Sequence, residues 1–546
     1  MTICNAVKHV NEKYKLLCDN VYHPEFNADT IVKLISKLKS GRAPGHDGLT
    51  PEHLKNAVNT RVPEYLSCIF NVCVIYGVIP DSFKIGIILP LLKKPNLDNT
   101  VPNNYRPIIL SSVVSKLLEY AMLNDVKSHE FHDMQYGFVQ GRGTQMAIVN
   151  ANDIIKYFNH RGTAVFGCSL DAEKAFDAIP HSILLYKCSS VLSDQWWRLM
   201  FVWYTNLKAM IRWNNELSDE FMLCKGTRQG GLTSPFLFNL MYQELIDGLS
   251  KEKGGMRVGK FSYNVFCYAD DLLLTSSTVT GLQSLINFAN NYVTEHGLSF
   301  NATKSNCITF GKCYLQPNPV WSVNNCNINN VDQLDYLGAI LGNNTDDHVN
   351  SRISKCRRAF YSLQGAGMCN NGAIPDVISH LWQTALQPIL TYAGECFSLK
   401  PSNISELDKI QSKLIKSSLG LSKYMRTSPL LSAMGVRKLN CLFQSQSLKL
   451  YNCIMFGKSR ITRFYIDSLR SSDTNACYSL PQRVRMTCLN HKLSFVKVTT
   501  DRSYCKSVCK KLKTILTDGI TDSCKMLLRN YDENNKFLLK LLLKPF

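Results

Sequence analysis

The sequence predicts an α+β protein, in which an antiparallel sheet with surrounding helices is followed by a basic, mainly helical C-terminal region. Three observations support this prediction. Residues 266–274 hold two apolar runs, each too short for a helix, on either side of a turn. Residues 164–170 have the composition of a further buried strand. Helical apolar spacing appears in residues 27–40 and 282–293, and a helical and basic pattern begins near residue 352.

The composition is that of an ordinary globular protein. At 546 residues with 45% hydrophobic content, the chain is long enough for several subdomains and a large core. The longest apolar region, residues 65–79, is interrupted by polar residues and is too short to cross a bilayer, so we expect a buried helix and no membrane partner. No secretory signal begins the sequence, so the 21 cysteines are expected to be reduced thiols in the cytosol or nucleus. Composition says nothing about the oligomeric state.

The positive charge is concentrated in the last third of the chain. Residues 1–350 carry equal numbers of basic and acidic side chains, 31 of each, whereas residues 351–546 carry 31 basic and 11 acidic ones. This asymmetry predicts a neutral catalytic body joined to a part that binds polyanions. The alternative is a positively charged surface that has no partner.

Two adjacent carboxylates, Asp270 and Asp271, stand at the predicted turn of the hairpin. Like charges this close repel each other, and two divalent cations about 3.5–4 Å apart would compensate them, as in polymerases and nucleases. A third carboxylate is expected from elsewhere, and Asp171 directly follows the buried strand 164–170. The alternative for the pair alone is a solvated turn.

A second predicted hairpin carries cations. Residues 85–92 are strand-like and lead into Lys93 and Lys94, and residues 104–110 form the next strand, with Arg106 on it. A cationic hairpin of this kind can hold a triphosphate, because negative charge builds on phosphoryl oxygens during transfer. The alternative is an ordinary surface hairpin.

Three further residues are candidates for contact with a nucleotide. Phe176 follows Asp171 closely, and its ring is expected to exclude a sugar 2′-hydroxyl by a clash. Gln229 lies in a glycine-containing loop where the backbone can approach a base, and Lys304 could protonate a departing pyrophosphate. Their alternatives are a core aromatic, a plain loop and a solvated lysine.

Four residues near the C-terminus were considered as zinc ligands: Cys488, His491, Cys505 and Cys509. Their spacing is loose in a chain where cysteine is abundant, so the pattern is weak evidence for zinc.

The order of the motifs resembles that of reverse transcriptases, most closely those of non-LTR (LINE-type) retrotransposons. The resemblance covers about residues 30–430. The matching blocks are Gly41–Gly48, Tyr105–Ile108, Gln135–Phe138 with Gly141–Thr144, Leu170–Asp171 with Ala175–Asp177, Thr227–Gly230 with Ser234–Pro235, Tyr268–Asp271, Gly297–Leu298 with Asn301 and Lys304, and Tyr336–Gly338.

The resemblance implies roles for particular residues. Asp171, Asp270 and Asp271 match the metal-binding triad, and Phe176 matches the sugar gate. Arg106, together with either Lys93 or Lys94, matches the triphosphate clamp. Gln229 matches the loop that contacts nucleotide and template, and residues 336–338 match the primer grip.

The resemblance also implies a right-hand polymerase fold of fingers, palm with an antiparallel sheet, and helical thumb. We expect an N-terminal helical extension over residues 1–73, fingers and palm over 74–342, and a thumb-like helical region over 343–430. The basic residues 431–546 have no assigned role.

The implied function is RNA-directed DNA synthesis, with two Mg²⁺ ions, or Mn²⁺ as an alternative. The expected partners are an RNA template, a DNA primer or target, and dNTPs. No endonuclease pattern is evident, so we expect a polymerase fragment of an element's open reading frame, with the nick made elsewhere. The competing hypotheses are a catalytically inactive nucleic-acid-binding relic and an intron-maturase-like splicing cofactor. An RNA-dependent RNA polymerase is disfavoured by Phe176 at the gate position.

Overall fold

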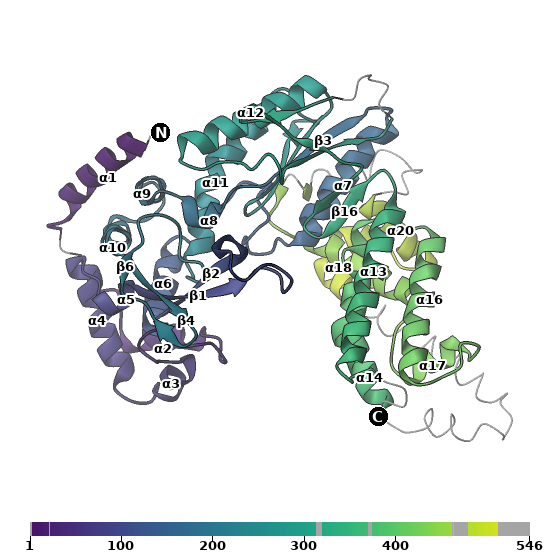
Figure 1. Cartoon of the computed structure of the whole chain (residues 1–546), viewed down its shortest axis with the longest axis horizontal. Coiled ribbons are helices and arrows are strands. Elements are labelled where there is room, and N and C mark those ends of the chain that lie inside the picture. The colour runs from purple at the N-terminus through teal and green to yellow at the C-terminus, as the bar shows by residue number, and fades with distance from the viewer. Residues whose placement is uncertain are drawn as a thin grey trace.

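The computed structural model describes residues 3–20, 22–312, 319–369, 374–460, 462–463 and 479–510. Figure 1 shows the N-terminal helices and a first sheet on the left, a second sheet with α12 (Val279–Glu295) above the centre, and a group of helices on the right. The predicted α+β class is confirmed as a mixture of helices and sheets.

The first sheet contains the predicted cationic hairpin. Its strand order is β2-β1-β4-β5, with β6 also paired to β4; β1 is antiparallel to β2 and parallel to β4. The bounds are β1 Ile85–Leu92, β2 Tyr105–Ser111, β4 Lys208–Trp213, β5 Glu216–Leu217 and β6 Phe221–Met222. The helices of this part are α1 Ile3–Leu17, α2 Ala28–Ser36, α3 Pro51–Asn56, α4 Val62–Tyr76, α5 Asp81–Lys84, α6 Val113–Asp125 and α10 Asp194–Thr205, with a 3-10 turn η1 at Pro102–Asn104.

A buried arginine joins three of these helices. Arg198 of α10 is 1% exposed, and its guanidinium donates to the carbonyl oxygens of Val74 and Ile75 at the end of α4, at 2.9 Å each. It also donates to the carbonyl oxygen of Leu17, where α1 ends. These carbonyls have no partner inside their own helices, so the arginine satisfies them without water.

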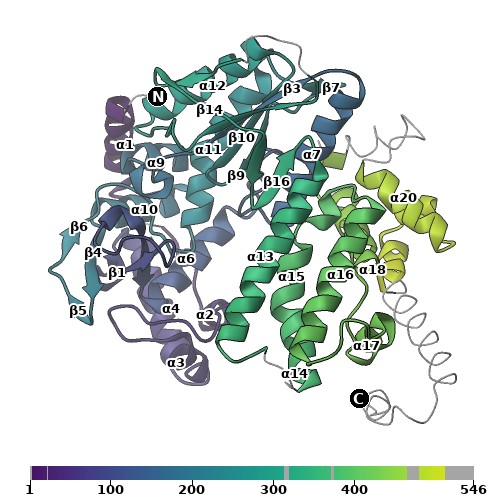
Figure 2. The ribbon, with the colours of Figure 1, turned by 45° about the vertical axis from the view of Figure 1, so that its right-hand side comes forward.

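The second sheet carries the predicted catalytic hairpin and has the order β14-β11-β3-β10-β9. Helices α7, α11 and α12 pack against it, and Figure 2 shows β9 and β10 at the centre of the molecule. Its strands are β3 Val165–Leu170, β9 Val265–Tyr268, β10 Asp271–Ser276, β11 Asn306–Phe310 and β14 Asn329–Asn330. The neighbouring elements are α7 Thr144–His160, α8 Ala175–Ala178, α9 His181–Cys188 and α11 Ser234–Lys251, and the short strands β7 Arg257–Val258, β8 Phe261–Ser262, β12 Ser322–Val323 and β13 Cys326–Asn327. A separate hairpin of β15 Gln333–Tyr336 and β16 Ala339–Gly342 follows them.

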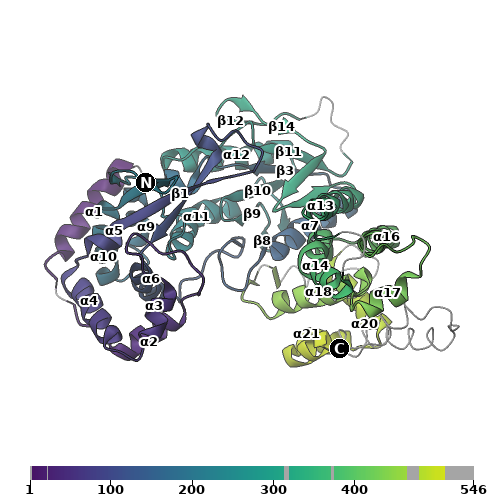
Figure 3. The same cartoon turned by 60° about the horizontal axis from the view of Figure 1, so that its bottom comes forward.

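The described parts of residues 345–510 are mainly helical, as predicted for the last third of the chain. Its elements are α13 Thr345–Gly365, α14 Pro375–Leu381, a π-helical turn η2 Trp382–Leu386, α15 Gln387–Thr391, a 3-10 turn η3 Gly394–Cys396, α16 Pro401–Ser418, α17 Thr427–Ala433, α18 Leu439–Met455, α20 Leu480–Asn490 and α21 Phe495–Thr500. Figure 3 shows these helices together on the right, with β9 and β10 between them and the first sheet. Helices α13 to α17 and the first part of α18 enclose a core of their own that runs from Val349 past residue 430 to Phe443. The rest of α18, α20 and α21 pack into the main core of the molecule.

The segment that begins at residue 479 packs against α7. Asp153 of α7 is 1% exposed; it accepts a hydrogen bond from the Leu480 N–H (2.8 Å) and pairs with Arg483 (Nη1 to Oδ1, 3.9 Å). Arg483 also donates to the carbonyl oxygen of Glu395 in η3. The buried carboxylate of Asp153 therefore attaches α20 to the helix that supports the second sheet.

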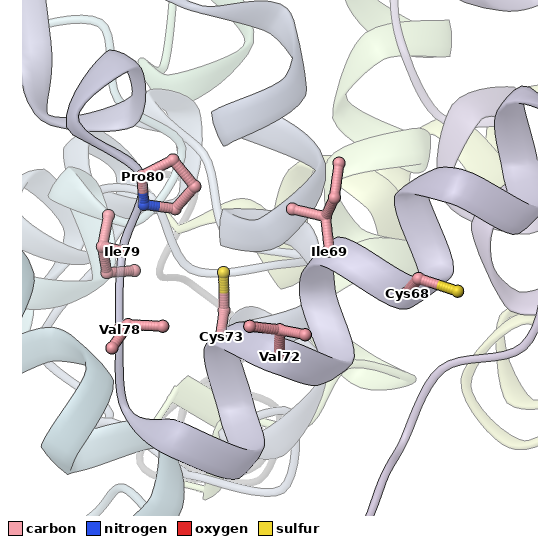
Figure 4. A pocket seen from close by; sticks show the side chains of 7 residues that line it. All are labelled: Cys68, Ile69, Val72, Cys73, Val78, Ile79 and Pro80. Carbon is pink, nitrogen blue, oxygen red and sulfur yellow. The ribbon is translucent and has the colours of Figure 1, made fainter.

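An apolar hollow of roughly 380 Å³ lies beside α4 and the segment that follows it. Figure 4 shows its lining side chains: Cys68, Ile69, Val72, Cys73, Val78, Ile79 and Pro80. None of the candidate site residues lines it. Separately, no helix among the described residues is both long enough and apolar enough to cross a bilayer.

Candidate active site

The register of the second sheet brings the candidate carboxylates into one row. Leu272 of β10 pairs with Leu170 of β3, so continuing the antiparallel register by one residue sets Asp271 opposite Asp171. Residues directly opposite each other on antiparallel strands have Cβ atoms about 4.5–5.5 Å apart and point to the same face. Two segments a hundred residues apart therefore deliver their carboxylates to the same end of the sheet.

Lys304 lies on the other side of Asp171, in the turn that precedes β11. The first residue of that strand, Asn306, pairs with Ser169 of β3. The Lys304 Nζ atom lies 3.9 Å from Asp171 Oδ2, and both side chains are partly exposed. The Asp171 backbone is held by two bonds, from its N–H to Ser305 Oγ (3.1 Å) and from the Asn301 N–H to its carbonyl oxygen (2.9 Å).

The tip of the hairpin is held in an unusual backbone conformation. Ala269 has a φ of +55°, which is uncommon for a residue with a side chain. Its N–H donates to Gln135 Oε1 (3.1 Å), and the same oxygen accepts from the Gly137 N–H (3.1 Å). A Cβ atom on Gly137 would lie 2.4 Å from Ala269 N, so only glycine fits there. The glycine-rich segment at 135–137 thus shapes the turn that carries Asp270.

The carboxylates raise one another's pKa. Desolvation raises the pKa of Asp271 to about 6, with further contributions from the charges of Asp270, Asp171 and Asp335. Desolvation also raises the pKa of Asp270, where the charge of Asp171 adds to the effect and that of Arg106 opposes it. Without a bound cation, the three carboxylates repel one another at neutral pH.

Burial is likewise the main cause that raises the pKa of Asp171, and Glu173 adds to it. The charges of Lys304 and Lys93 act in the opposite direction. The positive charges of Lys304 and Lys93 thus partly offset the negative charge of Asp171.

The donors fit divalent cations by their chemistry, because carboxylate oxygens are the ligands that hard cations such as Mg²⁺ take. The repulsion between the three carboxylates is the charge pattern that a dication relieves. In the part of the chain that the structure describes, however, no three His, Cys, Asp or Glu side chains are already gathered closely enough to form a metal-binding group. The acidic side chains thus lie near one another but would have to move closer together to coordinate an ion.

Charged residues of the cationic hairpin lower the pKa values of nearby carboxylates. Besides its effect on Asp171, the charge of Lys93 lowers the pKa of Asp177, although burial leaves that pKa raised overall. The Lys93 Nζ atom also donates to the carbonyl oxygen of Asn103 (2.8 Å). Both lysines are exposed, and among the described residues neither ammonium group forms an ion pair with the three carboxylates.

The loop with Gln229 is attached to the segment that follows β3. The Thr227 N–H donates to the carbonyl oxygen of Phe176 (2.7 Å), and Gln229 Nε2 donates to Asp177 Oδ1 (2.6 Å). On its other side, the carbonyl oxygen of Gln229 accepts from the Ile109 N–H of β2 (2.6 Å). Gln229 therefore connects the first sheet to the second, next to the gate candidate.

Phe176 is half-buried and lies flat against Phe238 of α11, with ring centroids 4.1 Å apart and planes at 17°. Sequence analysis did not identify Asp177 as the partner of Gln229. The only available signal was that Asp177 lies within the same short block as Phe176.

A buried ion pair supports the Gln229 loop from below. Arg228 Nη2 lies 2.5 Å from Glu119 Oε1, and the two side chains are 3% and 1% exposed. The other carboxylate oxygen of Glu119 accepts from the N–H and the Oγ1 of Thr233, at 2.9 and 3.1 Å. Sequence analysis did not identify this pair, because its members are 109 residues apart.

The turn at residues 336–338 is fixed by two helices of the last third. Leu337 and Gly338 both have positive φ, +53° and +78°. Tyr392 donates its hydroxyl to the carbonyl oxygen of Leu337 (2.7 Å), and Arg352 donates to that of Gly338 (2.9 Å). The helical part of the chain thus sets the position of this turn.

The zinc candidates do not form a common site. The thiols of Cys505 and Cys509 contact each other, whereas His491 Nε2 contacts Gln444 Oε1 at 3.1 Å. Within residues 479–510, as in the other described parts, no metal-binding group of three or more such side chains occurs.

Comparison with known proteins gives a consistent result. Residues 92–341 match the family "Reverse transcriptase (RNA-dependent DNA polymerase)". The chain is 24% identical to the RNA-directed DNA polymerase from mobile element jockey of Drosophila funebris, over 73% of this chain and 44% of the relative. It is 32% identical to a putative 115 kDa protein in the type-1 retrotransposable element R1DM of Drosophila melanogaster, over 46% of this chain and 23% of the relative.

It is also 27% identical to the Pol polyprotein from type-1 retrotransposable element R2 of Popillia japonica, over 55% of this chain and 43% of the relative. The chain therefore spans less than half the length of these curated relatives. Among solved structures, an apo telomerase from Candida tropicalis aligns with 49% of this chain and 55% of that chain, at 12% identity and a TM-score of 0.34.

Proposed function

We propose, from the match of residues 92–341 to the reverse transcriptase family and from the resemblance to non-LTR retrotransposon polymerases, that this chain extends a DNA primer on an RNA template. Its substrates are dNTPs, and its macromolecular partners are the RNA template and a DNA primer or target. The observation that carries the proposal is the placement of Asp271 opposite Asp171 at the end of two neighbouring strands, with Asp270 at the adjoining turn and Lys304 Nζ 3.9 Å from Asp171 Oδ2.

In this proposal Asp171, Asp270 and Asp271 hold two Mg²⁺ ions, with Mn²⁺ as an alternative. Bound cations of this type increase the acidity of a primer 3′-hydroxyl and stabilise charge on the phosphoryl oxygens. The three carboxylates supply the negative charge that keeps the cations in place. Their raised pKa values mean that protons compete with the cations for these oxygens at mildly acidic pH.

The chain's cations act on the substrate triphosphate. Arg106 and Lys93 lie close enough to the carboxylates to change their pKa values, which is the region a triphosphate held beside them would occupy. Lys304 is the proposed proton donor to the leaving pyrophosphate, because its ammonium group lies 3.9 Å from Asp171 Oδ2, beside the proposed cation site. Lys94 is the weaker candidate of the two neighbouring lysines.

Phe176 and Gln229 determine which nucleotide is accepted. The Phe176 ring excludes the 2′-hydroxyl of a ribonucleotide by steric clash. Gln229, held by Asp177, presents its side chain beside that ring, where the base and template strand would lie.

The architecture is assigned by analogy to a right hand. The second sheet with its flanking helices corresponds to a palm, the first sheet to fingers and α13–α16 to a thumb, so that fingers and palm span residues 74–342 and the thumb 343–430. Residues 1–73 form an N-terminal helical extension. The basic residues 431–546 add charge that suits contact with a nucleic-acid backbone.

The decisive experiment is primer extension on poly(rA)/oligo(dT) with Mg²⁺. Asp270→Ala should lower incorporation by about a thousandfold, because losing a cation ligand removes several kcal/mol of transition-state stabilisation. A matched control is Asp81→Ala, which removes an exposed carboxylate that pairs with Lys84 in the first turn of α5. Activity that survives Asp270→Ala would refute the site assignment. Tight RNA binding by the wild-type chain without dNTP incorporation would instead indicate a non-catalytic relic.

A further inference from the structure

Phe138 has a conformation that its residue type disfavours. Its φ is +57°, in the left-handed region where bulky side chains are rare, and its ring is 57% exposed. Because the Phe138 side chain is exposed, its burial contributes little free energy to offset the backbone strain. The stability of the fold therefore does not by itself explain a phenylalanine at this position.

The backbone beside Phe138 is held on both sides. The Gly137 carbonyl oxygen accepts from Asn239 Nδ2 of α11 (2.8 Å), and the Gly137 N–H donates to Gln135 Oε1. Gly137 also packs directly against Ala269 in the turn that carries Asp270. The strained residue is thus attached to the catalytic turn rather than to a free loop.

The Phe138 ring contacts the gate candidate. Its centroid lies 6.3 Å from that of Phe176, with the planes at 89°, an edge-to-face arrangement. On its other side Phe176 stacks on Phe238, which stacks on Tyr242 (4.8 Å, 26°), and both of these rings are fully buried. The Phe176 ring is therefore held between the face of the buried Phe238 ring on one side and the exposed Phe138 ring on the other.

We propose that Phe138 is a specificity-determining residue that holds the Phe176 ring in place from the open side and so maintains discrimination against the 2′-hydroxyl. The inference rests on the proposed function, in which Phe176 is the gate. A gate excludes a hydroxyl only if its ring cannot rotate away, and the Phe138 edge blocks that rotation where no protein core does. The backbone strain at Phe138 is the cost of presenting a ring at this point.

The test compares Phe138→Gly with Phe138→Ala. Both remove the ring, but only glycine also relieves the positive-φ strain. Incorporation of dTTP and of ribothymidine triphosphate is measured on poly(rA)/oligo(dT), together with the melting temperature. Both variants should lower the kcat/KM ratio of dTTP to the ribonucleotide by about tenfold, a part of the roughly hundredfold discrimination that a hydrophobic pocket achieves against one added hydroxyl.

Phe138→Gly should melt above Phe138→Ala while losing discrimination to the same extent. If Phe138 has a purely structural role, the variant with the higher melting temperature should also keep more of the discrimination between dTTP and the ribonucleotide. Lys492→Gly is the matched control, because it relieves a φ of +53° in the turn after α20 and should leave the ratio unchanged. Phe238→Leu, which removes the support from the buried side, should lower the ratio in the same direction.

A ratio within about twofold of wild type in both Phe138 variants would overturn the inference. So would a ratio that falls in the alanine variant and recovers in the glycine variant. Phe176→Ala separates this failure from that of the proposed function. If Phe176→Ala leaves the ratio unchanged while dTTP incorporation persists, the gate assignment itself is wrong.

Discussion

The buried pair of Glu119 and Arg228 is expected to be a major determinant of stability under the Gln229 loop. Both side chains are almost fully removed from solvent, and Glu119 also accepts two hydrogen bonds from Thr233. Arg228 retains only a long contact to the Phe83 carbonyl oxygen (3.4 Å) and the face of Trp203 (4.6 Å) as further partners. Removing either charge therefore leaves the other one buried without compensation.

The expected magnitude follows from these contacts. Glu119→Leu leaves a buried guanidinium unpaired, at about 3–5 kcal/mol, and leaves the Thr233 N–H without an acceptor, at about 1–3 kcal/mol more. Arg228→Met should cost about 3–5 kcal/mol for the carboxylate that remains. The double variant buries no unpaired charge and should cost only about 1–3 kcal/mol for the Thr233 N–H. The two substitutions should thus be strongly non-additive.

The free energy of unfolding is measured by urea titration, with tryptophan fluorescence as the signal. The control is Glu220→Leu, which breaks the exposed pair with Lys208 (3.0 Å, side chains 40% and 45% exposed) and should cost less than about 1 kcal/mol. A cost below about 1 kcal/mol for Glu119→Leu, or a double variant whose cost equals that of the two single variants combined, would refute this reasoning.

Two further predictions concern the charged groups of the site. The pKa of Asp271 is raised to about 6 from an ordinary 3.8, so its contribution to stability is present below pH 4 and is lost as pH rises through about 6. Asp271→Asn should therefore melt at a higher temperature than wild type at pH 8 in EDTA, with a gain in the free energy of unfolding of at most about 1 kcal/mol for a group this exposed. The difference should shrink as pH falls through about 6 and vanish below about pH 4. A lower melting temperature at pH 8 would contradict the repulsion. Lys93→Ala should raise the KM for dNTP about tenfold, and by more than Lys94→Ala does, because of the two neighbouring lysines it is Lys93 whose charge lowers the pKa of Asp171. Equal effects of the two variants on KM in steady-state kinetics would show that the triphosphate clamp does not distinguish these lysines.

Much of the local structure could be predicted from the sequence. Strands at residues 85–92, 104–110 and 164–170 and the hairpin around Asp270 were expected from short apolar runs between turn residues, and the structure has strands at 85–92, 105–111, 165–170, 265–268 and 271–276. Helices such as α2 and α12 were expected from their apolar spacing. These signals are local, since a few neighbouring residues decide whether an apolar face repeats every second or every third to fourth position.

The partners within the site could not be predicted in this way. Gln229 and Asp177 are 52 residues apart, and no local pattern indicates that they meet. Likewise, the contact of Phe138 with Phe176 depends on how the segment at 135–137 pairs with β9. Both contacts join loops and a short helix that are brought together only when the two sheets and their helices assemble.

The sequence by itself determined which residue types were available: three carboxylates at strand ends, a cationic hairpin, an aromatic ring near Asp171 and a basic last third. The tertiary structure alone decided which of them act together. It sets Lys304 and Asp271 on either side of Asp171, favours Lys93 over Lys94, and buries Glu119 with Arg228. The reason is that distances between remote charges, and the cost of removing them from water, are set by strand register and packing, which act over the whole chain.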